Sequence, residues 1–229
     1  MTTLANPIGT ELLDDPAADS AQVSQSLRHI ARANRWFGGS WAVGWAVRRA
    51  LAREPTAGAL TLLDVGAGSG DLAAVAVRAA RKRGTSLRVI ALERHRTAAA
   101  MLRDAGWSTV LGDASALPFR TGSVDWVLAS QMMHHFSPAA APDILAGLAR
   151  VARRAVLITD LRRSALARLG FAVAARALRF DSMTRHDGDT SIRRGYSVRA
   201  LEQLLTRAGI PAPVARRPGW RLVSVWSAP

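Results

Sequence analysis

Short apolar segments alternate with amphipathic segments through the middle of the chain. The apolar segments have strand length and are residues 60–65, 87–92, 108–111, 123–130 and 155–160. Between them, apolar residues recur at helical spacing and predict helices at 72–83, 96–105 and 141–151. Nearly continuous apolar strands separated by helices are typical of a parallel sheet covered on both faces. The pattern therefore predicts a doubly wound α/β core.

Helices are also predicted before this core. Helical spacing of apolar residues extends over 21–35 and again over 40–53, with Gly38 and Gly39 between the two segments. Residues 1–19 precede them and are expected to form a partly ordered arm. The chain thus enters the core from two N-terminal helices.

After the core comes an arginine-rich segment, residues 162–196. It contains a predicted helix at 164–178 and a polar loop around residues 186–189. The helix carries Arg168, Arg176 and Arg179 on one predicted face. The opposite face is expected to hold the apolar residues Leu166, Leu169, Phe171, Val173 and Leu178. We interpret this helix as a lid with solvated arginines; the alternative is peripheral contact with an anionic membrane that holds a lipophilic quinone.

The chain closes with a helix at 197–208 and two short strands near 212–217 and 220–226. Because only Pro218 and Gly219 separate these strands, they predict an antiparallel hairpin. The expected fold is a mostly parallel seven-stranded sheet in one domain over residues 1–229. Its parts are an N-terminal arm and helices (1–57), a core (58–160), an insertion (161–196) and a C-terminal helix and hairpin (197–229).

Composition narrows the class of protein. Hydrophobic residues make up 49% of the 229 residues, so the chain can bury a substantial core. Because it has no cysteine, disulfides, thiolate metal sites and a cysteine nucleophile are excluded. The acidic N-terminus lacks the basic and apolar regions of a signal peptide, and no apolar run has the length of about 18 residues that a membrane span needs. We expect a soluble cytoplasmic protein.

The net charge of +14 is unevenly distributed. Residues 1–27 contain four acidic residues and no lysine or arginine, and almost all the cations elsewhere are arginine. Such an excess suggests nucleic acid or an anionic membrane as a partner. An arginine bias this strong is also typical of a GC-rich genome, so charge alone does not identify the partner.

A glycine-rich loop follows the first core strand. Gly66, Gly68 and Gly70 alternate there, which allows a tight turn and the close approach of a ligand. A dinucleotide fingerprint would place its third glycine at the position of Asp71, whose charge repels phosphate. Asp64, just before the loop, adds a second carboxylate. Two acids beside a glycine loop favour a cationic ligand rich in hydroxyl and amine donors.

This segment resembles the first motif of class I S-adenosylmethionine-dependent methyltransferases, an acid followed by G-x-G-x-G, and the likeness continues in order through residues 60–160. The resemblance implies S-adenosylmethionine as cofactor. It implies that Glu93 binds the ribose hydroxyls, and that Asp113 and the Ala114 backbone lie near the adenine amino group. The alternatives are a salt bridge of Glu93 with Arg94 or Arg96, and a turn capped by Asp113. The expected cofactor-binding set is Asp64, Gly66, Gly68, Gly70, Asp71, Glu93, Asp113, Ala114 and Gln131.

The segment after the fourth strand bears on the acceptor. Ser130 to Met133 lack the N/D-P-P-Y/F motif of nucleic-acid adenine methyltransferases, and the region lacks the paired glutamates of arginine methyltransferases. His134, His135 and Phe136 resemble the corresponding stretch of quinone-biosynthesis and natural-product methyltransferases. A small molecule is therefore the expected acceptor, through O-methylation of a phenolic, quinol or polyketide-type compound in secondary metabolism. The alternatives are C-methylation of a quinone precursor, an RNA methyltransferase, and a non-catalytic module that binds the cofactor.

Residues beyond the cofactor motifs complete the expected site. His134 and His135 follow a strand whose carboxyl end is the usual place for ligands, so they are candidate catalytic bases; the alternative is a packing and capping role. No metal site is predicted, and the oligomeric state is left open. The residues expected to contact the acceptor from the N-terminal helices and the insertion, if they do not serve only as surface and packing residues, are Arg35, Trp36, Arg185, His186 and Tyr196.

Overall fold

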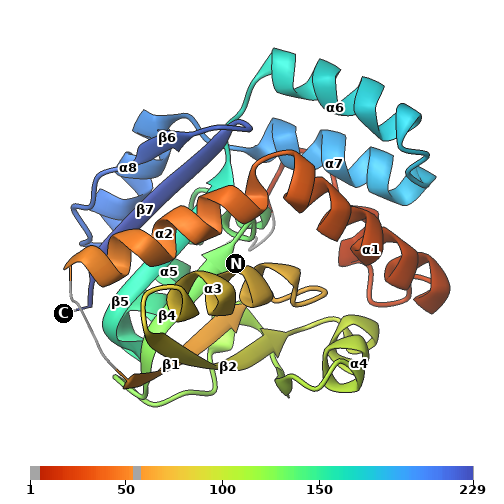
Figure 1. The fold of residues 1–229 in the computed structure, drawn as a ribbon. Helices are drawn as coiled ribbons and strands as arrows, with labels where there is room; N and C mark the ends of the chain where they lie inside the picture. The colour runs from red at the N-terminus through yellow and green to blue at the C-terminus, as the bar shows by residue number, and fades with distance from the viewer. Residues whose placement is uncertain (1–5, 54–57, 229) are drawn as a thin grey trace.

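The computed structural model describes residues 6–53 and 58–228, so the boundary expected at residue 57 and the start of the N-terminal arm lie outside the described residues. One sheet of seven strands runs through the molecule in the order β3-β2-β1-β4-β5-β7-β6 (Figure 1). The strands are β1 (Gly58–Val65), β2 (Thr85–Glu93), β3 (Ser108–Leu111), β4 (Val124–Ser130), β5 (Ala152–Leu161), β6 (Ala215–Arg217) and β7 (Arg221–Ser227). The predicted α/β fold is confirmed.

Strand pairing places a ligand site at one edge of this sheet. β1 pairs in parallel with both β2 and β4, so the chain winds away from β1 in two directions. Ligands of open α/β sheets bind at the carboxyl ends of the strands where the order reverses. The final pairings are antiparallel: β7 lies between β5 and β6 and runs opposite to both. The pairing of β6 with β7 confirms the predicted hairpin.

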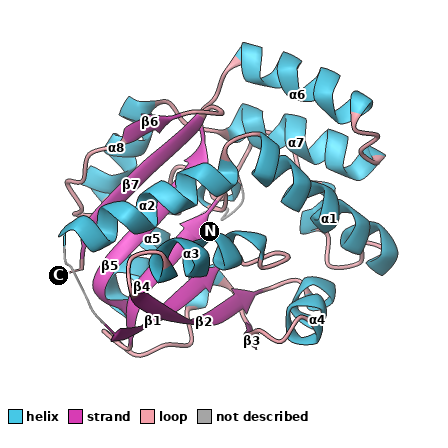
Figure 2. Cartoon of the chain, in the orientation of Figure 1, coloured by secondary structure: helices cyan, strands magenta, loops and turns pink. Residues whose placement is uncertain are grey.

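Helices cover both faces of the sheet (Figure 2). Apolar residues of α2 (Gly39–Arg53) and α3 (Asp71–Arg81) pack with Leu62 and Trp126 in one buried cluster. On the other face, α5 (Ala141–Val151) and α8 (Val198–Arg207) pack with Leu63 and Val127. Adjacent strand residues thus point to opposite cores, as the continuous apolar runs predict. α4 (Arg96–Asp104) lies beside β2 and β3.

The remaining helices, α1 (Ser20–Trp36), α6 (Ala165–Ala177) and α7 (Ser182–Arg194), lie together beyond the carboxyl ends of the strands (Figure 1). The prediction of a polar loop at residues 186–189 is wrong, since these residues lie within α7. Asp181 caps this helix by accepting a hydrogen bond from the Thr184 N–H at 2.8 Å. A Cβ at Gly188 would lie 2.2 Å from the Phe171 ring, so this glycine lets α6 and α7 pack closely.

The predicted division of α6 into an arginine face and an apolar face is also wrong. Ala167 and Ala175 are buried, and Phe171 is half-buried toward α7. Leu166, Leu169 and Val173 instead face solvent, with exposed fractions of 70%, 64% and 63%. Among the described residues, no helix combines the length and the hydropathy that crossing a membrane requires.

Candidate functional site

A pocket of about 750 Å³ opens at the carboxyl ends of the central strands. The glycine loop after β1 and the segment after β4 line one side of it, and α1, α6 and α7 line the other. The N-terminal arm closes a third side through the short helix η1 (Leu12–Asp14). Parts of the chain that are distant in sequence therefore meet around one cavity.

The glycine loop adopts backbone conformations that favour glycine. Gly66, Gly68 and Gly70 have φ angles of 73°, 56° and 76°. Gly66 and Gly68 line the pocket, so a ligand can approach their backbone. Gly70 does not; a Cβ there would lie 2.7 Å from the Trp107 indole nitrogen, which shows that close packing requires this glycine.

Glu93 lies at the end of β2 beside this loop. Its Oε2 accepts a hydrogen bond from the Gly68 N–H at 2.9 Å, and its Oε1 accepts one from the His95 N–H at 2.8 Å. The alternative salt bridge with Arg94 or Arg96 is absent from the described part of the chain, and Arg94 pairs with Asp14 at 2.7 Å. The Glu93 carboxylate is therefore anchored to the loop at the wall of the pocket.

Asp64 lies behind the glycine loop and is 2% exposed. It is not among the residues that line the pocket. Burial raises the pKa of Asp64 to about 7, and the nearby charges of Asp71 and Glu93 act in the same direction. A cationic ligand in the pocket would relieve this concentration of negative charge.

Asp113 and Ala114 line the pocket on the side of β3. Asp113 Oδ1 accepts hydrogen bonds from the Ser115 N–H at 2.8 Å and from the Ser115 hydroxyl at 2.7 Å. It thereby caps the short helix η2 (Ala114–Ala116), which is the capping arrangement considered from the sequence. The cap and the position at the pocket wall are compatible, because the carboxylate has further lone pairs for a ligand.

Asn34, which sequence reasoning missed, connects three elements at the pocket. Its Nδ2 donates to Asp71 Oδ2 at 3.0 Å, and its Oδ1 accepts from Gln131 Nε2 at 2.6 Å. Gln131 adopts a φ of 52°, which directs the chain after β4 into the pocket wall. The signal was present in the sequence: Asn34 follows Leu27 and Ile30 on the apolar side of α1, where a polar residue needs buried partners.

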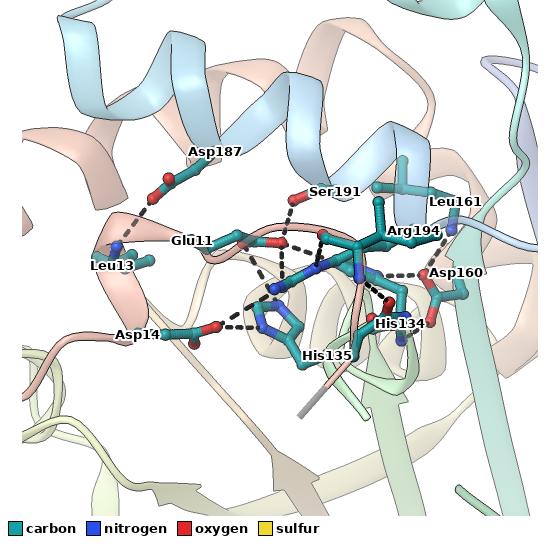
Figure 3. A network of polar contacts seen from close by, with 12 residues as sticks. Glu11, Leu13, Asp14, His134, His135, Asp160, Leu161, Asp187, Ser191 and Arg194 are labelled. Atoms are coloured by element: carbon teal, nitrogen blue, oxygen red, sulfur yellow. Dashed lines mark hydrogen bonds and ion pairs between the residues drawn. The ribbon is translucent and has the colours of Figure 1, made fainter. Parts of the chain in front are cut away.

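His134 lines the pocket, and Asp160 holds its ring (Figure 3). Asp160 Oδ1 lies 2.6 Å from His134 Nδ1, and Asp160 Oδ2 accepts from the His134 backbone N–H at 3.2 Å. The other ring nitrogen, Nε2, is buried and has no hydrogen-bond partner among the described residues. Glu11 Oε1 lies 3.7 Å from this nitrogen. Asp160 at Nδ1 favours the tautomer in which Nε2 can accept a proton.

His135 has a different environment, although its ring lies 4.5 Å from that of His134. Its Nδ1 pairs with Asp14 Oδ2 at 3.0 Å, and its Nε2 lies 3.6 Å from Glu11 Oε2. Burial lowers its pKa, but the charge of Glu11 and the pairing with Asp14 outweigh this and raise the pKa to about 9. His135 is thus protonated at neutral pH.

Glu11 links the arm to α7 and to both histidines. Its Oε1 accepts from Arg194 Nη1 at 3.0 Å and from the Ser191 hydroxyl at 2.9 Å. Glu11, His134 and His135 offer three potential metal-ligand atoms within 4.8 Å of one another, a cluster that the sequence did not predict. The positive charges of Arg194 and His135 already balance the Glu11 carboxylate of this cluster.

The arm is fastened to α7 at a second point. Both oxygens of Asp187 accept backbone hydrogen bonds. One comes from the Leu12 N–H at 2.7 Å, and the other comes from the Leu13 N–H at 2.9 Å (Figure 3). Asp187 is 3% exposed and lines the pocket. The expected partly ordered arm therefore folds, over its described residues, into part of the site.

The residues expected to contact the acceptor occupy different places. Trp36 lines the pocket and is 69% exposed, which places it at the mouth. Arg35 and Arg185 are exposed and do not line the pocket, and neither does His186, whose Nδ1 lies 2.9 Å from Asp187. Tyr196 is buried outside the lining, where its hydroxyl donates to the Met133 carbonyl at 2.7 Å. The structure thus brings only Trp36 of this group to the cavity.

Comparison with known proteins agrees with this geometry. A family model described as a methyltransferase domain matches residues 62–155, which include the glycine loop and the strands around it. No curated protein matches the chain.

Solved structures share the fold at low sequence identity. One is an S-adenosylmethionine-dependent methyltransferase from Aquifex aeolicus, with 16% identity, a TM-score of 0.55, and coverage of 80% of this chain and 89% of that chain. Magnesium protoporphyrin IX methyltransferase from Synechocystis PCC 6803 with bound S-adenosylmethionine has 14% identity, a TM-score of 0.56, and coverage of 87% and 84%. The CurJ carbon methyltransferase has 11% identity, a TM-score of 0.57, and coverage of 80% and 52%. At these identities the likeness shows the fold alone.

Proposed function

We propose that the chain is a class I S-adenosylmethionine-dependent methyltransferase, which its methyltransferase-domain match and its fold support, and that it methylates the hydroxyl of a small phenolic, quinol or polyketide-type acceptor. The pocket has two chemically distinct regions that support this proposal. Asp71, Glu93 and Asp113 line its acidic region, which suits the cationic cofactor. Phe37, Phe171 and other aromatic residues line another region, which suits an aromatic acceptor.

In the proposed site, the acidic region binds S-adenosylmethionine. Glu93 would accept hydrogen bonds from the ribose hydroxyls, and Asp113 with the Ala114 backbone would face the adenine. The glycine loop, Asp71 and Gln131 would surround the amino-acid part, while Asp64 adds negative charge from behind. Methyl transfer is an in-line displacement, so these contacts contribute mainly by proximity and orientation.

The observation that carries the O-methylation proposal is the Asp160–His134 pair. When bound, S-adenosylmethionine would supply its methyl group to the acceptor oxygen, so that an oxygen–carbon bond would replace the carbon–sulfur bond and S-adenosylhomocysteine would be the leaving group. His134 Nε2 would take the hydroxyl proton, since this nitrogen has no hydrogen-bond partner among the described residues while Asp160 holds Nδ1. A positioned base contributes about 10²–10⁴-fold to such a step. His135, with its pKa of about 9, would remain protonated and supply positive charge near the developing phenolate.

The test compares His134→Gln with His135→Gln, using labelled S-adenosylmethionine and a panel of phenols and quinols. We expect His134→Gln to lower kcat at least about 100-fold while cofactor affinity stays unchanged. His135→Gln should lower it less, because that residue does not accept the proton. Wild-type kcat in His134→Gln would refute the proposed base.

C-methylation of a quinone precursor is the second candidate, since a stabilised carbanion could use the same pocket. Carbon-linked label in the product would favour it over O-methylation. As part of the same proposal, we place the enzyme in the cytoplasm and in secondary metabolism. Transfer of label to purified RNA in the absence of a small acceptor would instead support an RNA methyltransferase.

A further inference from the structure

The solvent side of α6 carries an unusual row of apolar side chains. Leu166, Leu169 and Val173 are each more than 60% exposed. Their spacing of three and four residues places them on one side of the helix. Isolated exposed leucines are ordinary, but three large apolar residues in a row along one helix are typical of an interaction surface.

Arginines occur before, within and after this row along the chain, and acids are absent from the segment. Residues 162–179 contain five arginines and no aspartate or glutamate. Among the described residues, only Arg168 of these five forms an ion pair, with Asp189 at 2.8 Å. Arg163, Arg176 and Arg179 are exposed, and Arg176 lies three residues after Val173 on the same side. We call Leu166, Leu169 and Val173, together with Arg163, Arg176 and Arg179, the outer α6 face.

The inner side of the same helix belongs to the pocket. Ala167, Gly170 and Phe171 line the cavity from α6, and the exposed Trp36 lines it from the end of α1. The Phe37 and Phe171 rings meet edge to face at 6.2 Å, which connects the end of α1 with the middle of α6. One helix therefore presents apolar residues to solvent on one side and to the pocket on the other.

We propose that the outer α6 face docks on an anionic lipid surface, so that the pocket takes a lipophilic acceptor from the bilayer. The apolar row would enter the boundary between headgroups and acyl chains, and the arginines would lie among anionic headgroups. Charge complementarity selects this occupant, because a neutral apolar partner would gain nothing from three arginines that form no ion pair within the described part of the chain. The substrate class rests on the proposed function, whereas docking itself does not.

Binding to vesicles tests the docking. Wild-type protein should cosediment with vesicles of equimolar phosphatidylcholine and phosphatidylglycerol, and much less with phosphatidylcholine alone. Salt should weaken the binding, because the arginine contribution is screened. Since each arginine near an anionic surface contributes about fivefold, Arg163→Gln/Arg176→Gln/Arg179→Gln should bind about 100-fold more weakly. The matched control, Arg78→Gln/Arg81→Gln/Arg103→Gln, removes the same charge from exposed positions on α3 and α4 and should bind like wild type.

A second variant tests the apolar row. Leu166→Gln/Leu169→Gln/Val173→Gln keeps all charges and should lose more than about tenfold in vesicle affinity. Leu111→Gln, at an exposed leucine of the edge strand β3, is its control. Thermal unfolding midpoints close to wild type would show that the variants fold. Equal vesicle binding by wild type and either α6 variant, or equal loss in the arginine control, would overturn the proposal.

Two further readouts distinguish lipid docking from catalysis and from self-association. Methyl transfer to a water-soluble phenol should be unchanged in the α6 variants. If wild type binds vesicles but methylates no acceptor, the proposed function is wrong and the docking proposal is still supported. Sedimentation velocity tests whether a second copy covers the face. A wild-type dimer that the apolar triple variant dissociates, without vesicle binding, would contradict lipid docking.

Discussion

Asp64→Asn offers a prediction in which stability and cofactor affinity change in opposite directions. The Asp64 carboxyl is almost fully buried and its pKa lies near 7, mainly because burial disfavours its charged form. The folded pKa thus lies above the unfolded value of 3.8. A group with a raised folded pKa stabilises the protein fully below its unfolded pKa, and this contribution is lost as the pH rises through the folded pKa.

The magnitude follows from the size of the shift. A pKa change from 3.8 to about 7 corresponds to about 4 kcal/mol of destabilisation once the carboxyl is ionised above about pH 7. Asparagine occupies a similar volume and stays neutral. The unliganded Asp64→Asn variant should therefore be more stable than wild type by up to about 4 kcal/mol near pH 8, and the difference should vanish toward about pH 4. Urea unfolding across this pH range measures it.

Cofactor binding should show the opposite preference. S-adenosylmethionine brings positive charge, so it binds more tightly when Asp64 is ionised. If binding restores an ordinary carboxyl pKa, the wild-type Kd should rise about tenfold between about pH 8 and pH 6, beyond any change in Asp64→Asn. Near pH 8 the variant should bind at least about tenfold more weakly. Calorimetry measures the Kd of both proteins at each pH. Because the cofactor titrates identically in both experiments, the ratio of the two Kd values reports Asp64 alone.

Two outcomes would refute this reasoning. A variant that is less stable than wild type near pH 8 would show that Asp64 is not held at an energetic cost. Equal S-adenosylmethionine affinity in both proteins at both pH values would show that the charge of Asp64 does not contribute to cofactor binding.

Further predictions concern Glu93, Asn34 and His135. Glu93→Gln should weaken S-adenosylmethionine binding at least about tenfold by calorimetry, because a neutral amide replaces the carboxylate that would accept hydrogen bonds from the ribose hydroxyls. Unchanged affinity would show that Glu93 does not bind the cofactor. Asn34→Leu should destabilise the protein by about 1–3 kcal/mol in urea unfolding, since Asp71 and Gln131 each lose a buried partner, and a neutral result would contradict that role. The pKa of His135 is raised, so its contribution to stability, about 3 kcal/mol below about pH 6.5, should be lost as the pH rises to about 9. His135→Gln should flatten this decline in unfolding free energy, and an equally steep decline in the variant would argue against the ion pairs with Glu11 and Asp14.

The core could be predicted from the sequence because its signals are local. Continuous apolar runs such as 123–130 predict buried parallel strands, and three alternating glycines after the first of these strands predict a ligand loop. These features depend on backbone conformation and burial, and both can be predicted from residues that are adjacent in the sequence. The same local signals predicted the antiparallel hairpin at the C-terminus.

The failures share a different cause, which is dependence on distant partners. The α7 sequence is polar and contains Gly188, so its local pattern favours a loop. The helix forms with Asp187 bonded to the arm, about 175 residues away, and with Phe171 packed against Gly188. Periodicity likewise identified α6 as a helix, but it could not show that α7 would cover the Phe171 side and leave Leu166 in solvent. His134 was recognisable as a candidate, whereas its partner Asp160 became visible only in three dimensions.

The proposed methyl transfer to a small molecule can be followed with a labelled cofactor. Purified protein is incubated with methyl-labelled S-adenosylmethionine and a panel of phenols, quinols and polyketide-type aromatics, with bulk RNA as a parallel acceptor. We expect label in a low-mass product that organic solvent extracts, lost in His134→Gln, and none in RNA. Tight cofactor binding with no labelled small product, or label in RNA alone, would contradict the claim.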